Sequence, residues 1–136
     1  MARILTGLLV LTALVLAPAA PAVAAGPLVV QIQASQVTLN ADGTVSVPLR
    51  LRCSPPTYAF EIGVGVRQGS TIGSAGGLGG PIPPCTGKWE RTTLTVTAES
   101  GTFVAGTATV DAYVALYDPV EDHDLFVEDS ATVRLR

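Results

Sequence analysis

Apolar and polar residues alternate along most of the chain from Leu28 onward, with a period of two residues. No window shows the i, i+3, i+4, i+7 spacing of an amphipathic helix, whereas alternation with a period of two places apolar side chains on one face of a strand. The clearest case is Thr44 to Cys53, in which every second residue from Val45 to Cys53 is apolar. Further strands are predicted near 28–34, 58–66, 93–98, 107–116 and 131–135.

About seven strands at these spacings predict an all-β domain, most simply an immunoglobulin-like antiparallel β-sandwich with a single disulfide. Two antiparallel sheets packed face to face would bury each apolar stripe. A small β-barrel is the alternative, and the pattern alone does not separate the two.

Turn residues divide these strands. The tetrapeptide Asn40 to Gly43 offers turn chemistry, so Val37–Leu39 and Val45–Cys53 are predicted to form a hairpin. Pro48 lacks an N–H group for the ladder, which indicates an edge strand or a bulge.

One segment, Gly69 to Gly87, is rich in glycine and proline and is predicted to be irregular. A loop of this length serves either recognition or a plain crossover between sheets.

The first 25 residues have the composition of a secretory signal peptide. Arg3 supplies a positive start, Ile4 to Leu16 form an apolar run, and Ala17 to Ala25 are rich in alanine and proline. An uncleaved membrane anchor needs about 20 apolar residues, more than this run holds. We therefore expect cleavage before Gly26, one domain over 26–136, and a secreted, extracellular product with no membrane anchor.

Cys53 and Cys85 are the only cysteines, and in an exported chain they predict a disulfide. A structural zinc site would need more ligands than two thiols and the single histidine, His123. The two cysteines are also too far apart for a C-x-x-C redox motif.

The chain carries a formal net charge of −3 at pH 7. Nucleic acid and anionic membranes are unfavourable partners, because phosphate binding needs clustered cations and the basic residues are dispersed along the sequence. Outside the predicted leader, which holds Arg3, they are Arg50, Arg52, Arg67, Lys88, Arg91, Arg134 and Arg136.

No set of residues predicts catalysis. A nucleophile needs an activating base, yet the chain has one histidine and no G-x-S-x-G motif. Ser74 lies in a short Gly-Ser-Ala-Gly sequence that matches only half of a nucleophile elbow. Paired carboxylates are the remaining option, although acidic groups are scarce outside one cluster. No catalytic residues are therefore assigned.

That cluster runs from Asp118 to Asp129 and holds six acidic residues: Asp118, Glu121, Asp122, Asp124, Glu128 and Asp129. Grouped oxygen ligands are what Ca²⁺ uses, so Asp118, Glu121, Asp122 and Asp124 are candidates for a weak metal site. The EF-hand pattern is absent, and a solvated loop between strands is the favoured interpretation. No other cofactor is expected.

The aromatic residues Trp89, Tyr113 and Tyr117 are candidates for recognition, because an aromatic ring with a polar group serves both cores and ligand surfaces. Tyr113 falls on the polar face of its strand and is expected to be exposed. Packing is the favoured role for these rings as a group.

Several segments resemble a family of small secreted actinobacterial proteins classed as a domain of unknown function. They are the strand from Ala41 that ends at Cys53, Val66 to Gly69, the C-x-G-x-W segment from Cys85 to Trp89, and Phe103 to Ala108. The resemblance implies a leader, one disulfide and an all-β domain, and it transfers no activity.

These features predict a secreted binding or adhesion module for an unknown extracellular or cell-wall ligand. The segments Gly69–Gly87 and Asp118–Asp129 would be its variable surfaces. One alternative is a small-molecule carrier resembling the enediyne apoproteins of actinobacteria, although those have a second disulfide that this chain lacks. An enzyme is the least favoured class.

Overall fold

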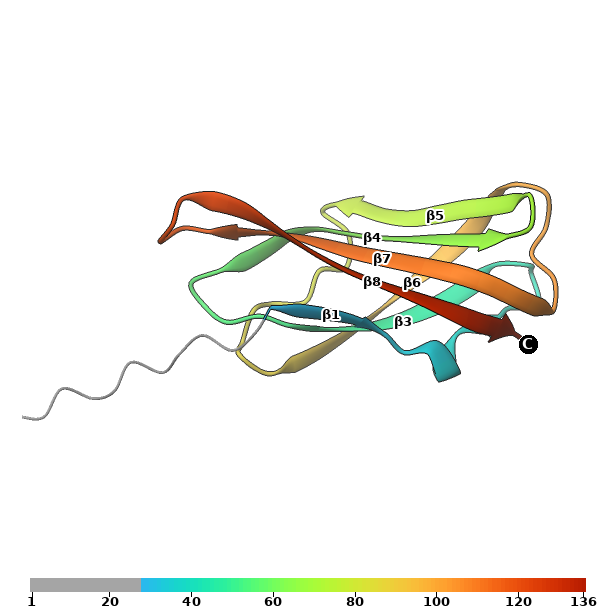
Figure 1. Ribbon diagram of the computed structural model, residues 1–136, viewed down its shortest axis with the longest axis horizontal. Helices are drawn as coiled ribbons and strands as arrows, with labels where there is room; N and C mark the ends of the chain where they lie inside the picture. The colour runs from blue at the N-terminus through green and yellow to red at the C-terminus, as the bar shows by residue number, and fades with distance from the viewer. Residues whose placement is uncertain (1–27) are drawn as a thin grey trace, which may run out of the picture.

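The computed structural model describes residues 28–136, which form an antiparallel all-β domain (Figure 1). The predicted leader and its cleavage site lie outside the described residues. The elements in chain order are β1 (Val29–Ile32), a short 3-10 helix η1 (Ala34–Gln36), β2 (Thr38–Leu39), β3 (Val45–Arg52), β4 (Tyr58–Gln68), β5 (Thr71–Leu78), β6 (Trp89–Ser100), β7 (Gly106–Asp118) and β8 (His123–Leu135). Within this part of the chain, no helix is long and apolar enough to cross a membrane.

The strands form one continuous hydrogen-bonded path in the order β1-β3-β6-β5-β4-β7-β8, with β2 paired to β3. Strand β6 changes partner along its length: residues 89–96 pair with β3, and residues 97–100 pair with β5. This change bends the sheet around a single core. Figure 1 shows β4, β5 and β7 on one side of the molecule and β1 and β3 on the other.

The sheet nearly closes into a barrel between its two end strands. At this seam the amide N–H of Ile32 in β1 donates to the Asp129 carboxylate of β8 over 2.7 Å, and the Leu39 N–H donates to the Arg136 carbonyl over 3.3 Å. An inward-pointing carboxylate on an end strand also discourages pairing with another chain. The all-β prediction is confirmed, and of the two architectures left open by the pattern, the continuous sheet corresponds to the near-closed barrel.

The core consists of the inward-facing members of each alternating run. In β3 buried and half-buried residues alternate without interruption, and Val45, Val47 and Leu49 are at most 1% exposed. Phe103, in the connection between β6 and β7, is the largest buried side chain. The predicted alternation therefore holds along the strands that build the core.

The predicted hairpin forms, with Thr38 and Leu39 opposite Ser46 and Val45. The edge position inferred for Pro48 is wrong, because β3 lies between β6 on one side and β1 with β2 on the other. The proline is tolerated because it faces the interruption between β1 and β2. There its carbonyl accepts the Gln33 N–H over 2.9 Å and no ladder donor is needed from its nitrogen.

The irregular loop predicted for Gly69–Gly87 is wrong for its first half, where β5 pairs with β4 from Thr71 to Leu78. The glycines there allow close approach of neighbouring strands. A Cβ atom at Gly73 would collide with the Thr97 carbonyl oxygen, and one at Gly76 with the Ile62 carbonyl oxygen. In sequences, clustered glycines usually indicate a loop. In this segment they instead allow two paired strands to pack closely.

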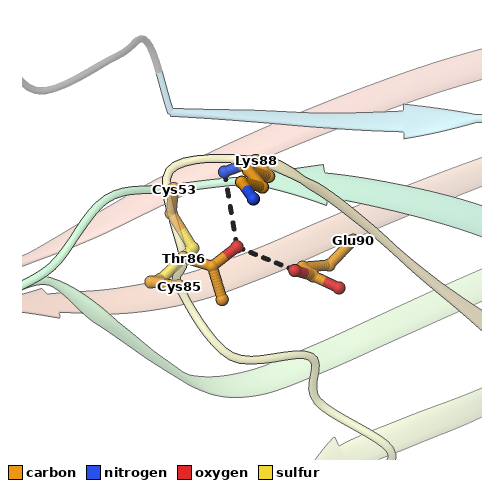
Figure 2. Close-up of a disulfide and its surroundings, with 5 residues drawn as sticks. All are labelled: Cys53, Cys85, Thr86, Lys88 and Glu90. Carbon is orange, nitrogen blue, oxygen red and sulfur yellow. Dashed lines mark hydrogen bonds between the residues drawn. A yellow bond between two sulfur atoms is a disulfide. The ribbon is translucent and has the colours of Figure 1, made fainter.

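The predicted disulfide joins Cys53 at the end of β3 to Cys85, with 4.7 Å between the Cα atoms (Figure 2). The Gly87 N–H donates to the Cys53 carbonyl over 2.8 Å, and the Thr86 hydroxyl donates to Glu90 over 2.7 Å. The bridge therefore fixes the irregular second half of the glycine-rich segment just before β6 begins.

Candidate functional site

A groove lies on the outer face of strands β4, β7 and β8, which together with β5 we call the four-strand layer. It encloses about 550 Å³ and is lined by Gly65, Asp111, Ala112, Tyr113, Glu128, Asp129 and Ser130. Two smaller hollows adjoin it, share Gly65, and extend toward Ser74 of β5. We call this surface the Tyr113 groove.

The strand register explains the hollow. One row across the layer reads Ser74, Gly65, Asp111, Ser130, and the next reads Gly76, Gly63, Tyr113, Glu128. Glycine occupies β4 in both rows, so no side chain rises between the polar residues of β5 and those of β7. The groove is therefore a direct result of glycine at alternate positions of one strand.

Tyr113 lies across this glycine floor. Its ring fills the space that a Cβ atom at Gly63 would need, and its hydroxyl donates to Glu61 Oε1 over 2.7 Å. This hydrogen bond raises the pKa of the Tyr113 phenol above its usual value, with desolvation adding to the effect. The sequence predicted an exposed ring, whereas the ring is half-buried because Gly63 lets it lie down against the sheet.

Carboxylates surround the ring. Asp111 accepts a hydrogen bond from the Ser130 hydroxyl over 2.6 Å, and Glu99 accepts one from the Ser74 hydroxyl over 2.8 Å. Glu128 is exposed beside Tyr113. A carboxylate has about four lone-pair positions, so each of these groups retains acceptors for a ligand.

This arrangement suits binding. A half-buried aromatic ring offers a flat apolar surface, and the acids beside it accept hydrogen bonds from hydroxyl or ammonium groups.

Ser74 is hydrogen-bonded to Glu99, and His123 lies at the far end of β8, opposite Asp118. The serine and the histidine that a nucleophilic mechanism would combine are thus on different parts of the layer.

The acidic segment Asp118–Asp129 is not a loop, as the sequence suggested, but the end of the β7–β8 hairpin, with a turn at 119–122. Asp118 Oδ1 accepts the Val120 N–H over 2.9 Å, and Asp122 accepts the Tyr117 hydroxyl. Among residues 28–136, no three His, Cys, Asp or Glu side chains are grouped as metal ligands. The weak calcium site at Asp118, Glu121, Asp122 and Asp124 stays a prediction.

The other two candidate aromatics lie outside the groove. Tyr117 packs against Tyr58 with 5.6 Å between ring centroids, and its bond to Asp122 raises its pKa. A bulge in β4 lies between Ala59 and Glu61, and Tyr58 before it is 52% exposed. Trp89 lies on the other side of the molecule, under the Arg50 guanidinium.

Sequence reasoning found Tyr113 but missed its partners Gly63, Gly65, Asp111, Glu128 and Ser130. They come from three strands and meet only through strand pairing. One signal was present, the Gly-Val-Gly spacing of 63–65, which places two glycines on the outer face of a strand.

No family model, no curated protein and no solved structure matches the chain. The class that the structure defines is a near-closed antiparallel β-barrel with one disulfide and a surface groove.

Proposed function

We propose that this protein is an extracellular binding module without catalytic activity, and that the Tyr113 groove takes a hydroxyl-rich ligand such as a carbohydrate. The observation that carries the proposal is the Tyr113 ring lying on a glycine floor between carboxylates. A sugar ring presents C–H groups that pack on an aromatic face, and hydroxyls that donate to carboxylates.

The sequence and the disulfide support the extracellular part of the proposal. The first 25 residues have the pattern of a leader, and a single disulfide suits an oxidising compartment. We also propose that the strands have an immunoglobulin-like arrangement. We further propose that the chain belongs to the small secreted actinobacterial family that it resembles.

The shape of the groove favours a binding module over a carrier of small molecules. A carrier encloses an apolar ligand in a deep cleft. Here the interior is filled by buried side chains, and the groove lies open on a sheet face, where five of its seven lining residues have polar side chains.

The proposal is tested with a panel of neutral cello-, chito- and xylo-oligosaccharides, measured by isothermal titration calorimetry on the disulfide-bonded protein. We expect at least one member to bind, and Tyr113→Ala to weaken binding about tenfold or more, as loss of an aromatic anchor does. Because Tyr113→Ala also removes a packed ring, Glu128→Gln provides an exposed second variant within the groove.

The matched control is Glu121→Gln, which makes the same charge change at an exposed residue of the hairpin turn. Equal losses for Glu128→Gln and Glu121→Gln would contradict a specific role for the groove. Absence of binding to every member of the panel would overturn the proposed ligand class.

A further inference from the structure

A second surface lies on the outer face of β1, β3 and β6 and has the opposite charge. Strand pairing places Arg50 opposite Arg91 and Arg52 opposite Trp89. These four residues, here called the Arg-Trp patch, are separated along the chain and joined only by the β3–β6 register. Basic residues that are dispersed along the sequence are therefore brought together by the fold at this patch.

The cations of this patch are held by neutral partners. The Arg50 Nε donates to Gln31 Oε1 over 2.7 Å, and its guanidinium carbon lies 4.4 Å from the centroid of the Trp89 ring. The Arg52 Nε is buried and has no hydrogen-bond partner among the described residues. None of these contacts supplies a negative charge to either arginine.

Like charges placed directly opposite each other on a sheet repel, and an acidic neighbour usually offsets the repulsion. On this face the outward positions beside the arginines are Val29, Gln31, Ser46, Pro48, Thr93 and Thr95, none of which is acidic. A chain with a net charge of −3 thus keeps three arginines together without a carboxylate among them. Such a cluster fits a ligand that supplies the negative charge.

We infer that the Arg-Trp patch binds an acidic polysaccharide. Guanidinium groups pair with carboxylates through two parallel hydrogen bonds, and Trp89, which is 40% exposed, offers an aromatic edge to a sugar ring. Neighbouring cations along β3 are about 7 Å apart, a spacing that suits repeated charges on a polymer. Most of the outward positions beside the patch carry polar side chains, which disfavours insertion into a lipid surface.

The test uses polygalacturonate as the acidic polymer and dextran as the neutral one, with affinity measured at several salt concentrations. We expect polygalacturonate to bind, dextran not to bind, and affinity to fall as salt rises. Arg91→Gln, at an exposed position, should weaken binding about threefold to tenfold, and Arg52→Gln combined with it should weaken binding further.

Two controls separate this site from general charge and from the groove. Arg134→Gln makes the same charge change at an exposed position of β8 and should leave the affinity within about twofold, because exposed charges more than about 10 Å apart are screened. Glu128→Gln should leave polygalacturonate binding unchanged, so failure of the groove proposal would not be mistaken for failure of this one.

Three results would overturn the inference. The first is no binding of polygalacturonate. The second is an equal loss for Arg134→Gln and Arg91→Gln. The third is equal or tighter binding of oligothymidylate, or of vesicles of phosphatidylglycerol and phosphatidylcholine, which would assign the patch to a different macromolecule.

Discussion

At the scale of single residues, the glycines of β4 and β5 serve two distinct purposes. Gly63 makes room for the ring of Tyr113, whereas Gly73 makes room for the backbone of β6. A ring at the end of a side chain can move aside, but a paired strand cannot. Substitution of the two glycines should therefore have different costs.

We expect Gly73→Ala to lower the free energy of unfolding by about 2–3 kcal/mol and Gly63→Ala by about 1 kcal/mol, since overpacking against backbone is the harder to relieve. Urea denaturation measures both. Gly65→Ala is the control, because a Cβ there meets only the Gly73 carbonyl oxygen, at 4.0 Å. Equal costs at Gly63 and Gly73 would contradict this distinction.

The hydrogen bond from Tyr113 to Glu61 links stability to pH. Because folding raises the pKa of Tyr113 above its unfolded value of about 10, the contribution is complete below pH 10 and is lost as pH rises through the folded pKa. The free energy of unfolding should therefore fall above pH 10, and less steeply in Tyr113→Phe. An unchanged slope in Tyr113→Phe would count against the bond.

At the scale of elements, two contacts join parts of the domain that the strand ladders do not pair. Asp129 of β8 accepts the backbone N–H of Ile32 in β1 across the seam, and the disulfide fixes the segment that leads from β5 into β6. Neither depends on the alternating pattern that defines the strands. Each can be removed by changing one or two side chains.

Removal of the Asp129 carboxylate should loosen the seam. Asp129→Ala leaves a partly buried N–H without its charged acceptor and should cost about 1.5–3 kcal/mol, while Asp129→Asn retains an acceptor and should cost less. Urea denaturation gives the cost, and amide exchange at Ile32 should accelerate in Asp129→Ala. Glu128→Gln is the neighbouring exposed control, and unchanged Ile32 exchange in Asp129→Ala would show that the seam is held otherwise.

The disulfide should stabilise the domain chiefly by restricting the unfolded chain. It closes a loop across a sequence separation of 32, which corresponds to roughly 3–4 kcal/mol in the chain-entropy model. The double variant Cys53→Ser, Cys85→Ser should lose about this amount in urea denaturation while keeping a β-type circular dichroism spectrum. A loss below about 1 kcal/mol would mean that the bridge adds little to the contacts around Gly87.

Strand positions followed from the alternation, because burial on one face imposes a period of two on the residues that fill it. Strand β5 within Gly69–Gly87 was not predicted from the alternation. The glycines that make β5 possible have no side chains, so no alternation of apolar and polar residues can be detected there. The acidic residues of β8 were misassigned for a related reason. Their charge obscured the half-buried Leu125 and Val127 between them.

At the scale of the whole molecule, the barrel has two outer surfaces of unlike chemistry, the Tyr113 groove with its carboxylates and the Arg-Trp patch with its cations. Sequence reasoning identified Tyr113 and Trp89 as candidate aromatics, because residue type is visible in the chain. It could not identify their neighbours, since these are brought together by register between strands distant in sequence. The sites are therefore properties of the fold more than of any local motif.

Amide chemical-shift mapping tests most directly whether the Tyr113 groove binds a ligand. The isotope-labelled, disulfide-bonded protein is titrated with the oligosaccharide that binds tightest. We expect perturbations centred on Gly63, Gly65, Asp111, Tyr113 and Ser130. Perturbations confined to the hairpin turn at 119–122 or to the Arg-Trp patch, or no perturbation at saturating ligand, would contradict it.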